Sequence, residues 1–111
     1  MKINILLTSV GGEMAPAIIT HLKNIKKYKI TVIGVDISNE AIGKNFCDFF
    51  YEVPRGEDKN YNNKILKISL KHKINLLIPT SDEEALNLSK INSVFQKNKI
   101  QLVATSHSTI S

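Results

Sequence analysis

The fold of this chain is decided by the stretch INILLTSVGG at residues 3–12. Residues 3–8 form a short apolar run rich in β-forming side chains. A run that is apolar on both faces suits a central parallel strand covered by helices on each side. The glycines end the strand, and a helix is expected over residues 13–27, because apolar side chains recur there at helical spacing and Pro16 falls in the first turn.

The same alternation continues to the end of the chain. Further strands are expected at residues 30–36, 48–53, 75–79 and 100–104, and further helices at residues 60–72 and 81–97, with a short helical piece around residues 40–44. Ser81 and Glu84 have the spacing of a capping box, which predicts where the last helix begins. The sequence therefore predicts an α/β fold, a three-layer Rossmann-like sandwich whose mainly parallel sheet of about five strands has helices on both faces.

Length and composition fit one domain. The 111 residues lie near the middle of the usual domain size range, and residues 1–104 are expected to form the domain, followed by a polar tail at residues 105–111. Apolar residues make up 42% of the chain but aromatic residues only 6%, so the core is expected to consist of Ile, Leu and Val. Cys47 is the single cysteine, which excludes an internal disulfide and favours a small buried thiol over a reactive one.

The net charge of +5 raises the question of nucleic acid, because clustered Lys and Arg displace counterions from phosphates. Here the cations are scattered lysines, Arg55 is the single arginine, and no aromatic residues are interleaved with them as a stacking platform requires. We expect a lysine-rich solvated surface and no nucleic-acid partner. No signal peptide precedes the first strand, and no apolar run approaches the ~20 residues that span a membrane, so the cytoplasm is the expected location.

Three segments follow strands at the edge where open parallel sheets collect their ligands, beyond the carboxyl ends of the strands. The candidate substrate-binding residues in these segments are Gly11 and Gly12 after the first strand, Asp36 after the second, and Thr80, Ser81, Asp82 and Glu83 after the fourth.

Each candidate also has a purely structural interpretation. The glycines either admit a ligand to the backbone or only make a tight turn. Asp36 stands where a Rossmann domain keeps its ribose-binding acid, or it caps the next turn. The acidic residues at 82–84 suit a helix N-terminus electrostatically, or they receive an amine or a cation. Residues 13–15 supply no glycine for a dinucleotide fingerprint, and no P-loop lysine follows.

Catalytic machinery is not expected in this chain. The three histidines have no plausible acid or nucleophile partner, and a nucleophile elbow, a metal-ligand cluster and paired catalytic carboxylates are all missing from the sequence. The first strand ends in Thr8 and Ser9, which also disfavours a phospho-acceptor receiver domain. We therefore predict no catalytic, cofactor-binding or metal-binding residue.

Taken in order, the motifs resemble the opening of carbamoyl-phosphate-synthase-like ATP-grasp proteins. The stretches that carry the resemblance are TSVGG at residues 8–12 with APAII at 15–19, GVD at 34–36, YEVP at 51–54 and NLLIPTSDEE at 75–84. Each is weak alone, but they occur in register over nearly the whole chain.

The resemblance implies a pre-ATP-grasp domain, the Rossmann-like N-terminal unit of ligases that activate a carboxylate as an acyl phosphate, which an amine or ammonia then attacks. In such proteins ATP and magnesium are held by two later lobes. The lysines and acidic residues with which those lobes bind them have no counterparts in this sequence. The resemblance implies that the domain contributes substrate contacts through residues 11, 12, 36 and 80–83, and that residues 105–111 begin a linker to those lobes. Its partners would be the lobes of the same parent chain and a small carboxylate or amine substrate, and the chain alone would be inactive.

Two other functions stay open from the sequence. One is a minimal nucleotide-binding Rossmann domain of an oxidoreductase, which would use Gly11, Gly12 and Asp36. The other is a stand-alone interaction module or homodimer, because a parallel sheet has edges that a partner can cover.

Overall fold

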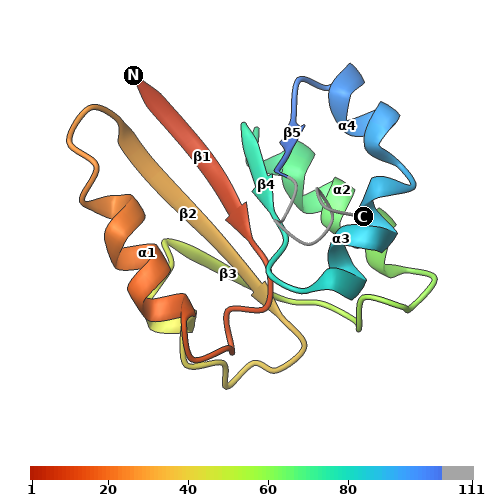
Figure 1. Cartoon of the computed structure of the whole chain (residues 1–111), viewed down its shortest axis with the longest axis horizontal. Coiled ribbons are helices and arrows are strands. Elements are labelled where there is room, and N and C mark those ends of the chain that lie inside the picture. Colours follow the sequence, from red (N-terminus) through yellow and green to blue (C-terminus); the bar gives the residue numbers. More distant parts are fainter. Residues whose placement is uncertain (104–111) are drawn as a thin grey trace.

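The computed structural model describes residues 1–103, so the predicted tail at residues 105–111 lies outside the described residues. Figure 1 shows strands and helices in alternation. Their bounds are β1 (Lys2–Leu7), α1 (Ala15–Lys23), β2 (Lys29–Asp36), the 3₁₀ helix η1 (Lys44–Phe46), β3 (Phe49–Glu52), α2 (Tyr61–Lys71), β4 (Leu76–Ile78), α3 (Asp82–Ser89), α4 (Asn92–Lys97) and β5 (Gln101–Leu102).

The five strands form one sheet in the order β3-β2-β1-β4-β5, and every neighbouring pair is parallel. The predicted α/β class and the Rossmann-like arrangement are thus confirmed. β1 is the central strand, paired with β2 along its whole length and with β4 over Ile5, Leu6 and Leu7. Its carboxyl end is therefore flanked by the ends of β2 and β4.

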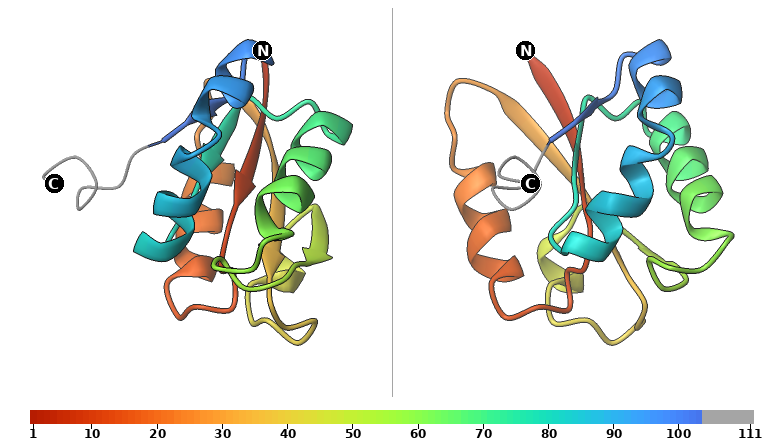
Figure 2. Two further views of the ribbon diagram at one scale, coloured as in Figure 1. Left: turned by 90° about the vertical axis from the view of Figure 1, so that its right-hand side faces the viewer. Right: turned by 45° about the vertical axis from the view of Figure 1, so that its right-hand side comes forward.

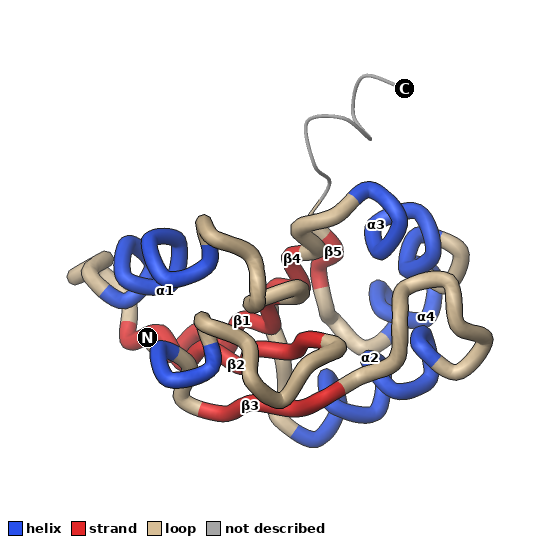
Figure 3. Tube along the Cα trace, turned by 90° about the horizontal axis from the view of Figure 1, so that it is seen from below, coloured by secondary structure: helices blue, strands red, loops and turns tan. Residues whose placement is uncertain are grey.

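Helices cover both faces of the sheet (Figure 2, right, and Figure 3). On one face the core joins Leu7 and Val32 of the sheet to Ala15 and Ile19 of α1. On the other face Leu6, Ile33 and Leu77 pack against α2, α3 and α4 through the fully buried side chains of Tyr61, Ile65, Leu88 and Phe95. Leu6 and Leu7 serve opposite cores because successive residues of a strand point to opposite faces.

The helices α2 and α4 end in the same way, with a lysine in a left-handed conformation. Lys73 has a φ of 51° and Lys99 a φ of 61°. In each case the next amide, of Ile74 or Ile100, returns to a carbonyl five residues earlier, which is the Schellman pattern of helix ends. Both isoleucines are buried, so each motif turns the chain from a helix into the following strand.

The last predicted helix is broken. Residues 81–97 form two short helices, α3 and α4, because the amides of Lys90 and Ile91 bond three residues back and close the first helix. Ser89 contributes to the break, since its hydroxyl donates to the Leu86 carbonyl at 2.6 Å and competes with the helical bonding. The first helix is also shorter than predicted: it ends at Lys23, and residues 24–28 turn back to start β2.

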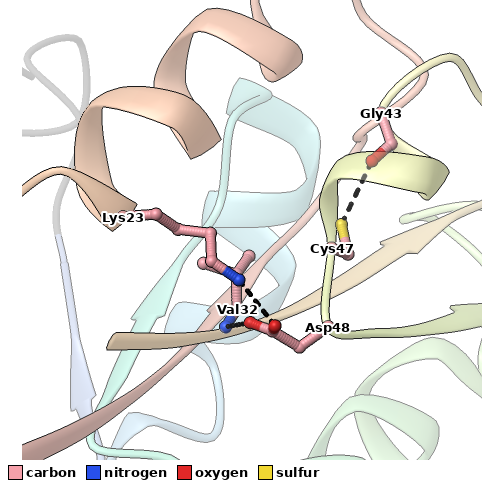
Figure 4. Close-up of polar contacts among 5 residues, drawn as sticks. All are labelled: Lys23, Val32, Gly43, Cys47 and Asp48. Atoms are coloured by element: carbon pink, nitrogen blue, oxygen red, sulfur yellow. Dashed lines mark hydrogen bonds and ion pairs between the residues drawn. The ribbon is translucent and has the colours of Figure 1, made fainter. Parts of the chain in front are cut away.

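An ion pair fastens α1 to the start of β3 (Figure 4). Lys23 Nζ lies 2.5 Å from Asp48 Oδ1, and the other carboxylate oxygen accepts a bond from the Val32 amide at 2.8 Å. Burial opposes ionisation of Asp48, but the bonds from Lys23 and Val32 outweigh it and hold the pKa of the carboxyl below its usual value.

Cys47, beside this pair, is half-buried, whereas the sequence predicted a buried thiol. Its Sγ donates to the Gly43 carbonyl oxygen at 3.3 Å (Figure 4). Burial, together with the neighbouring charge of Asp48, raises the pKa of the thiol to about 11. A thiol with so little thiolate at neutral pH is unreactive.

Candidate functional site

The three segments predicted to share one edge of the sheet do meet there. Gly11, after β1, donates its amide to Asp36 Oδ1 at the end of β2, at 3.0 Å. Thr80, after β4, donates its amide to Thr8 Oγ1 at 3.0 Å and its hydroxyl to the Thr8 carbonyl at 2.8 Å. The end of β1 is therefore bonded to the ends of both neighbouring strands.

A cavity of about 170 Å³ lies at this edge. It is called here the carboxyl-edge cavity, and its lining comes from four strand-end segments: Ser9, Asp36, Ile37, Arg55, Gly56, Glu57, Ser81, Glu83 and Glu84. Of the residues predicted from the sequence, the structure places Asp36, Ser81 and Glu83 in the lining. The other four predicted residues stand beside the cavity in the same turns and do not line it.

The glycine turn is bonded to the chain itself. The Gly11 amide is taken by Asp36, and the Gly12 amide donates to the Ser9 carbonyl at 3.1 Å. A Cβ on Gly11 would lie 2.9 Å from both carboxylate oxygens of Asp36, whereas a Cβ on Gly12 would meet only the Ser9 carbonyl oxygen, at 3.4 Å. Gly11 is therefore required for the close approach of Asp36, and Gly12 is not.

Asp36 acts as a turn acid in this structure. Its Oδ1 accepts the Gly11 amide and its Oδ2 accepts the Ser38 amide, each at 3.0 Å. Both oxygens thus fasten backbone turns, which is the capping role left open by the sequence. The carboxylate still lines the cavity, and each of its oxygens has further lone-pair capacity.

The carboxylate with four hydroxyl donors at this edge is Glu84, which the sequence predicted either as part of the helix start or as an acid that receives an amine or a cation. Its side chain is buried, with 7% of the residue surface exposed. Oε1 accepts hydroxyl bonds from Thr8 (2.9 Å), Ser9 (2.5 Å) and Ser81 (2.8 Å), and Oε2 accepts one from Tyr61 at 2.5 Å. These five residues are called here the hydroxyl–carboxylate cluster.

Only half of the predicted capping box forms. Ser81 Oγ accepts the Glu84 amide at 3.3 Å, as predicted, which caps the first turn of α3. The Glu84 side chain turns inward to the hydroxyls instead of reaching back to the Ser81 amide. A buried carboxylate requires hydrogen-bond donors to offset its lost hydration, and the cluster supplies four hydroxyl donors.

The cluster explains two local features. Ser9 has a φ of 52°, a conformation that non-glycine residues rarely adopt, and its hydroxyl is held there by Glu84. Burial and the adjacent charge of Glu84 raise the pKa of the Tyr61 phenol far above its usual value, so Tyr61 remains a hydrogen-bond donor. The sequence signal for this cluster was the pair of hydroxyl residues that follows β1, but no local pattern connects them to Tyr61.

The loop before α2 is held against Glu84 as well. A Cβ on Gly56 would lie 3.0 Å from Glu84 Cγ, and the Asn87 side-chain amide donates to the Gly56 carbonyl. The cavity wall formed by residues 55–57 is therefore fixed to α3.

The charge around the cavity is mainly negative. Asp36, Glu57, Glu83 and Glu84 face one cation, Arg55, and no ion pair within residues 1–103 neutralises that guanidinium. Such a lining suits a ligand that carries a cationic amine. Within the same residues no group of three His, Cys, Asp or Glu side chains is arranged to hold a metal ion, and no helix is long and apolar enough to cross a membrane.

Solved structures with similar folds come from several classes of enzyme. Glycinamide-RNase-transformylase T from Mycobacterium tuberculosis matches with a TM-score of 0.67 at 13% identity, over 89% of this chain and 28% of that one. The dTDP-glucose 4,6-dehydratase of Bacillus anthracis, in complex with NAD, matches with a TM-score of 0.60 at 14% identity, over 90% and 36%. UDP-GlcNAc 2-epimerase from Neisseria meningitidis matches with a TM-score of 0.55 at 12% identity, over 93% of this chain and 32% of that one.

These identities show the shared fold alone, and the chain spans only about a third of the length of each of these three structures. No curated protein matches the sequence. The family comparison is specific: the model for the PylC-like N-terminal domain matches residues 5–103, nearly the whole chain. This match confirms the kinship inferred from the motifs, that of a pre-ATP-grasp N-terminal domain. The chain belongs to the PylC-like N-terminal domain family.

Proposed function

We propose that this chain is the substrate-side domain of an ATP-dependent carboxylate–amine ligase. In this proposal the ATP-grasp lobes of the same parent protein hold ATP and magnesium and form the acyl phosphate. The domain described here places a small carboxylate or amine substrate against them, in the cytoplasm, and is not catalytic alone.

The observation that carries the proposal is the carboxyl-edge cavity. Its walls come from the ends of β1, β2 and β3 and the start of α3, so it stands where open parallel sheets bind ligands. Asp36 and Glu83 give it acidic groups that could receive an amine, and Arg55 could receive a carboxylate. The hydroxyl–carboxylate cluster beneath fixes these loops, which is the preorganisation that a substrate-positioning site needs.

Calorimetry of the isolated chain with ATP, with and without magnesium, tests the proposal. We expect no measurable heat of binding, because the lobes that hold the nucleotide would lie elsewhere. Saturable submillimolar affinity for ATP would contradict it. A second check is to translate the reading frame beyond residue 111, where ATP-grasp lobes should follow.

The oxidoreductase alternative keeps one supporting observation, the fold similarity to a dehydratase solved with NAD. The glycine turn disfavours it, because the Gly11 amide already donates to Asp36 and the Gly12 amide to the Ser9 carbonyl, so neither is free for a pyrophosphate. We expect no binding of NAD in the same calorimeter. Tight NAD binding that Asp36→Ala abolishes would support the alternative instead.

A further inference from the structure

A second and larger hollow adjoins the carboxyl-edge cavity and shares Arg55 and Ile37 with it. It has a volume of about 850 Å³ and runs between the end of β3 and the helix α2. One wall is the segment from Glu52 to Arg55, and the other consists of Asn60, Asn63, Lys64 and Lys67. We call this hollow the β3–α2 groove.

The helix wall of the groove is a continuous polar stripe. Positions 60, 63, 64 and 67 are spaced by three and four residues, so they share one face of α2. Two of these positions supply ammonium groups and two supply carboxamides. The stripe therefore presents hydrogen-bond donors along the whole length of the groove.

The charge of the groove is opposite to that of the carboxyl-edge cavity. Among the residues that line the groove, Arg55, Lys64 and Lys67 outnumber a single carboxylate, Glu52, although Arg55 also borders the four carboxylates of the carboxyl-edge cavity. In the described part of the chain the one ion pair joins Lys23 to Asp48, so none of the three groove cations forms a direct ion pair there. Cations that line a concave surface reinforce each other's field and raise the local concentration of anions.

The start of α2 adds little to this field. Its first turn contains no acidic residue, and Asn60 makes no side-chain capping bond. In α3, by contrast, Ser81 caps the helix and three acidic residues occupy the first turn. Just before the helix, the Asp58 carboxylate accepts the Asn60 amide at 2.8 Å and offsets part of the positive end of the α2 dipole, so the positive field of the groove comes from its side-chain cations.

We propose that the β3–α2 groove binds the phosphate group of a small phosphorylated molecule. Arg55 can take two phosphate oxygens in a bidentate pair, and the lysines act as flexible point charges on the remaining oxygens. The volume exceeds that of a phosphate ion and suits a ligand of metabolite size. This site shares Arg55 and Ile37 with the carboxyl-edge cavity, but Lys64 and Lys67 line the groove alone, so variants of these two lysines test it separately from the ligase proposal.

NMR titration of the ¹⁵N-labelled 111-residue chain tests the site. The probes are pyrophosphate and ribose 5-phosphate, with ribose as the uncharged control, at about 50 and about 200 mM salt. We expect saturable shifts of amides in residues 52–67 with both phosphates and none with ribose, weakening at the higher salt. Shifts that do not saturate, or that spread evenly over the lysines of the surface, would overturn the proposal.

Matched charge variants separate the groove from general electrostatics. K64Q/K67Q removes two cations from the groove, and K90Q/K97Q removes two from the surface of the α3–α4 region. We expect the first variant to bind pyrophosphate at least about tenfold more weakly, and the second less than about twofold. If both variants bound pyrophosphate equally weakly, net charge alone would explain the loss of affinity, and the site would be refuted. Circular dichroism establishes that each variant is folded.

Discussion

The Tyr61 hydroxyl, at the first residue of α2, donates a hydrogen bond of 2.5 Å to Oε2 of Glu84, in the first turn of α3. The two residues are 23 positions apart in the sequence and both are buried. Through the other oxygen of Glu84, the same carboxylate holds the hydroxyls that follow β1. One buried charge thus connects two helices to the central strand at the edge where the candidate site lies.

Replacing Glu84 by Gln should destabilise the fold. A neutral amide offers one acceptor oxygen to four hydroxyls and loses their charge-assisted bonds, so we expect a loss of about 2 kcal/mol in the free energy of unfolding. Urea unfolding measures it. Glu83→Gln is the matched control, an exposed carboxylate one residue away, and should change stability by less than about 0.5 kcal/mol. Similar losses in both variants would contradict the role given to Glu84.

Stability should fall at alkaline pH through Tyr61. Its pKa is raised in the folded state, so its stabilising contribution is complete below the unfolded value of about 10 and is lost as the pH rises above it. Urea unfolding of the wild type and Tyr61→Phe between pH 8 and pH 11.5 or so isolates this contribution. The variant should be less stable at pH 8 but lose less stability on going to high pH. Parallel curves would show that Tyr61 does not carry the effect.

The two glycines after β1 should differ in their tolerance of a methyl group. Gly11→Ala forces a Cβ against both oxygens of Asp36 and should cost about 1–3 kcal/mol. Gly12→Ala meets no close contact, and no glycine within residues 1–103 has a positive φ, so this change should be neutral or stabilise by up to about 1 kcal/mol. Thermal unfolding of both variants measures the two changes in stability. A larger loss at Gly12 would be inconsistent with the turn described here.

Cys47 should react slowly with thiol reagents in the native protein. Raising the thiol pKa from 9.0 to about 11 lowers the thiolate fraction at pH 8 about 100-fold, and the greater nucleophilicity of the more basic thiolate recovers about tenfold of this. We expect modification to be at least about tenfold slower than in denaturant, before steric protection is counted. The reaction with Ellman's reagent measures both rates, and equal rates would refute the buried environment.

Replacing the two lysines that have a positive φ, Lys73 and Lys99, by glycine should stabilise the fold. Lys73→Gly and Lys99→Gly remove a side chain from a conformation that glycine prefers, and each should stabilise by about 0.5–1 kcal/mol. Lys71→Gly, inside the last turn of α2, should instead destabilise by about 0.5–1 kcal/mol. Chemical unfolding of the three variants tests for opposite signs. Destabilisation at Lys73 or Lys99 would mean that the lysine side chain makes a compensating contact.

Most of the fold could be predicted from local patterns. The apolar runs of β1 and β4 and the helical spacing of residues 60–72 depend only on side-chain type and periodicity, and the parallel sheet with helices on both faces follows from their alternation. The break between α3 and α4 could not be predicted in the same way. It depends on a serine hydroxyl that competes for a helical carbonyl, and the apolar pattern of residues 85–95 runs across it without interruption.

The candidate site was predictable in position but not in its bonding. The sequence located Asp36, Ser81 and Glu83 at the carboxyl edge because the ends of parallel strands share that edge. It could not show that Asp36 fastens two backbone turns, or that Arg55 stands between an acidic cavity and a basic groove. Those relationships join segments that lie far apart in the sequence.

The sequence by itself determined the α/β class, the order of elements and the edge at which polar turns collect, because these depend on periodicity and on local turn chemistry. Only the tertiary structure decided which donors meet the buried carboxylate of Glu84 and which cations are left without partners. The physical reason is distance: a hydrogen bond or an ion pair requires contact within a few ångströms, and packing of the sheet and helices, not spacing along the chain, brings those atoms together.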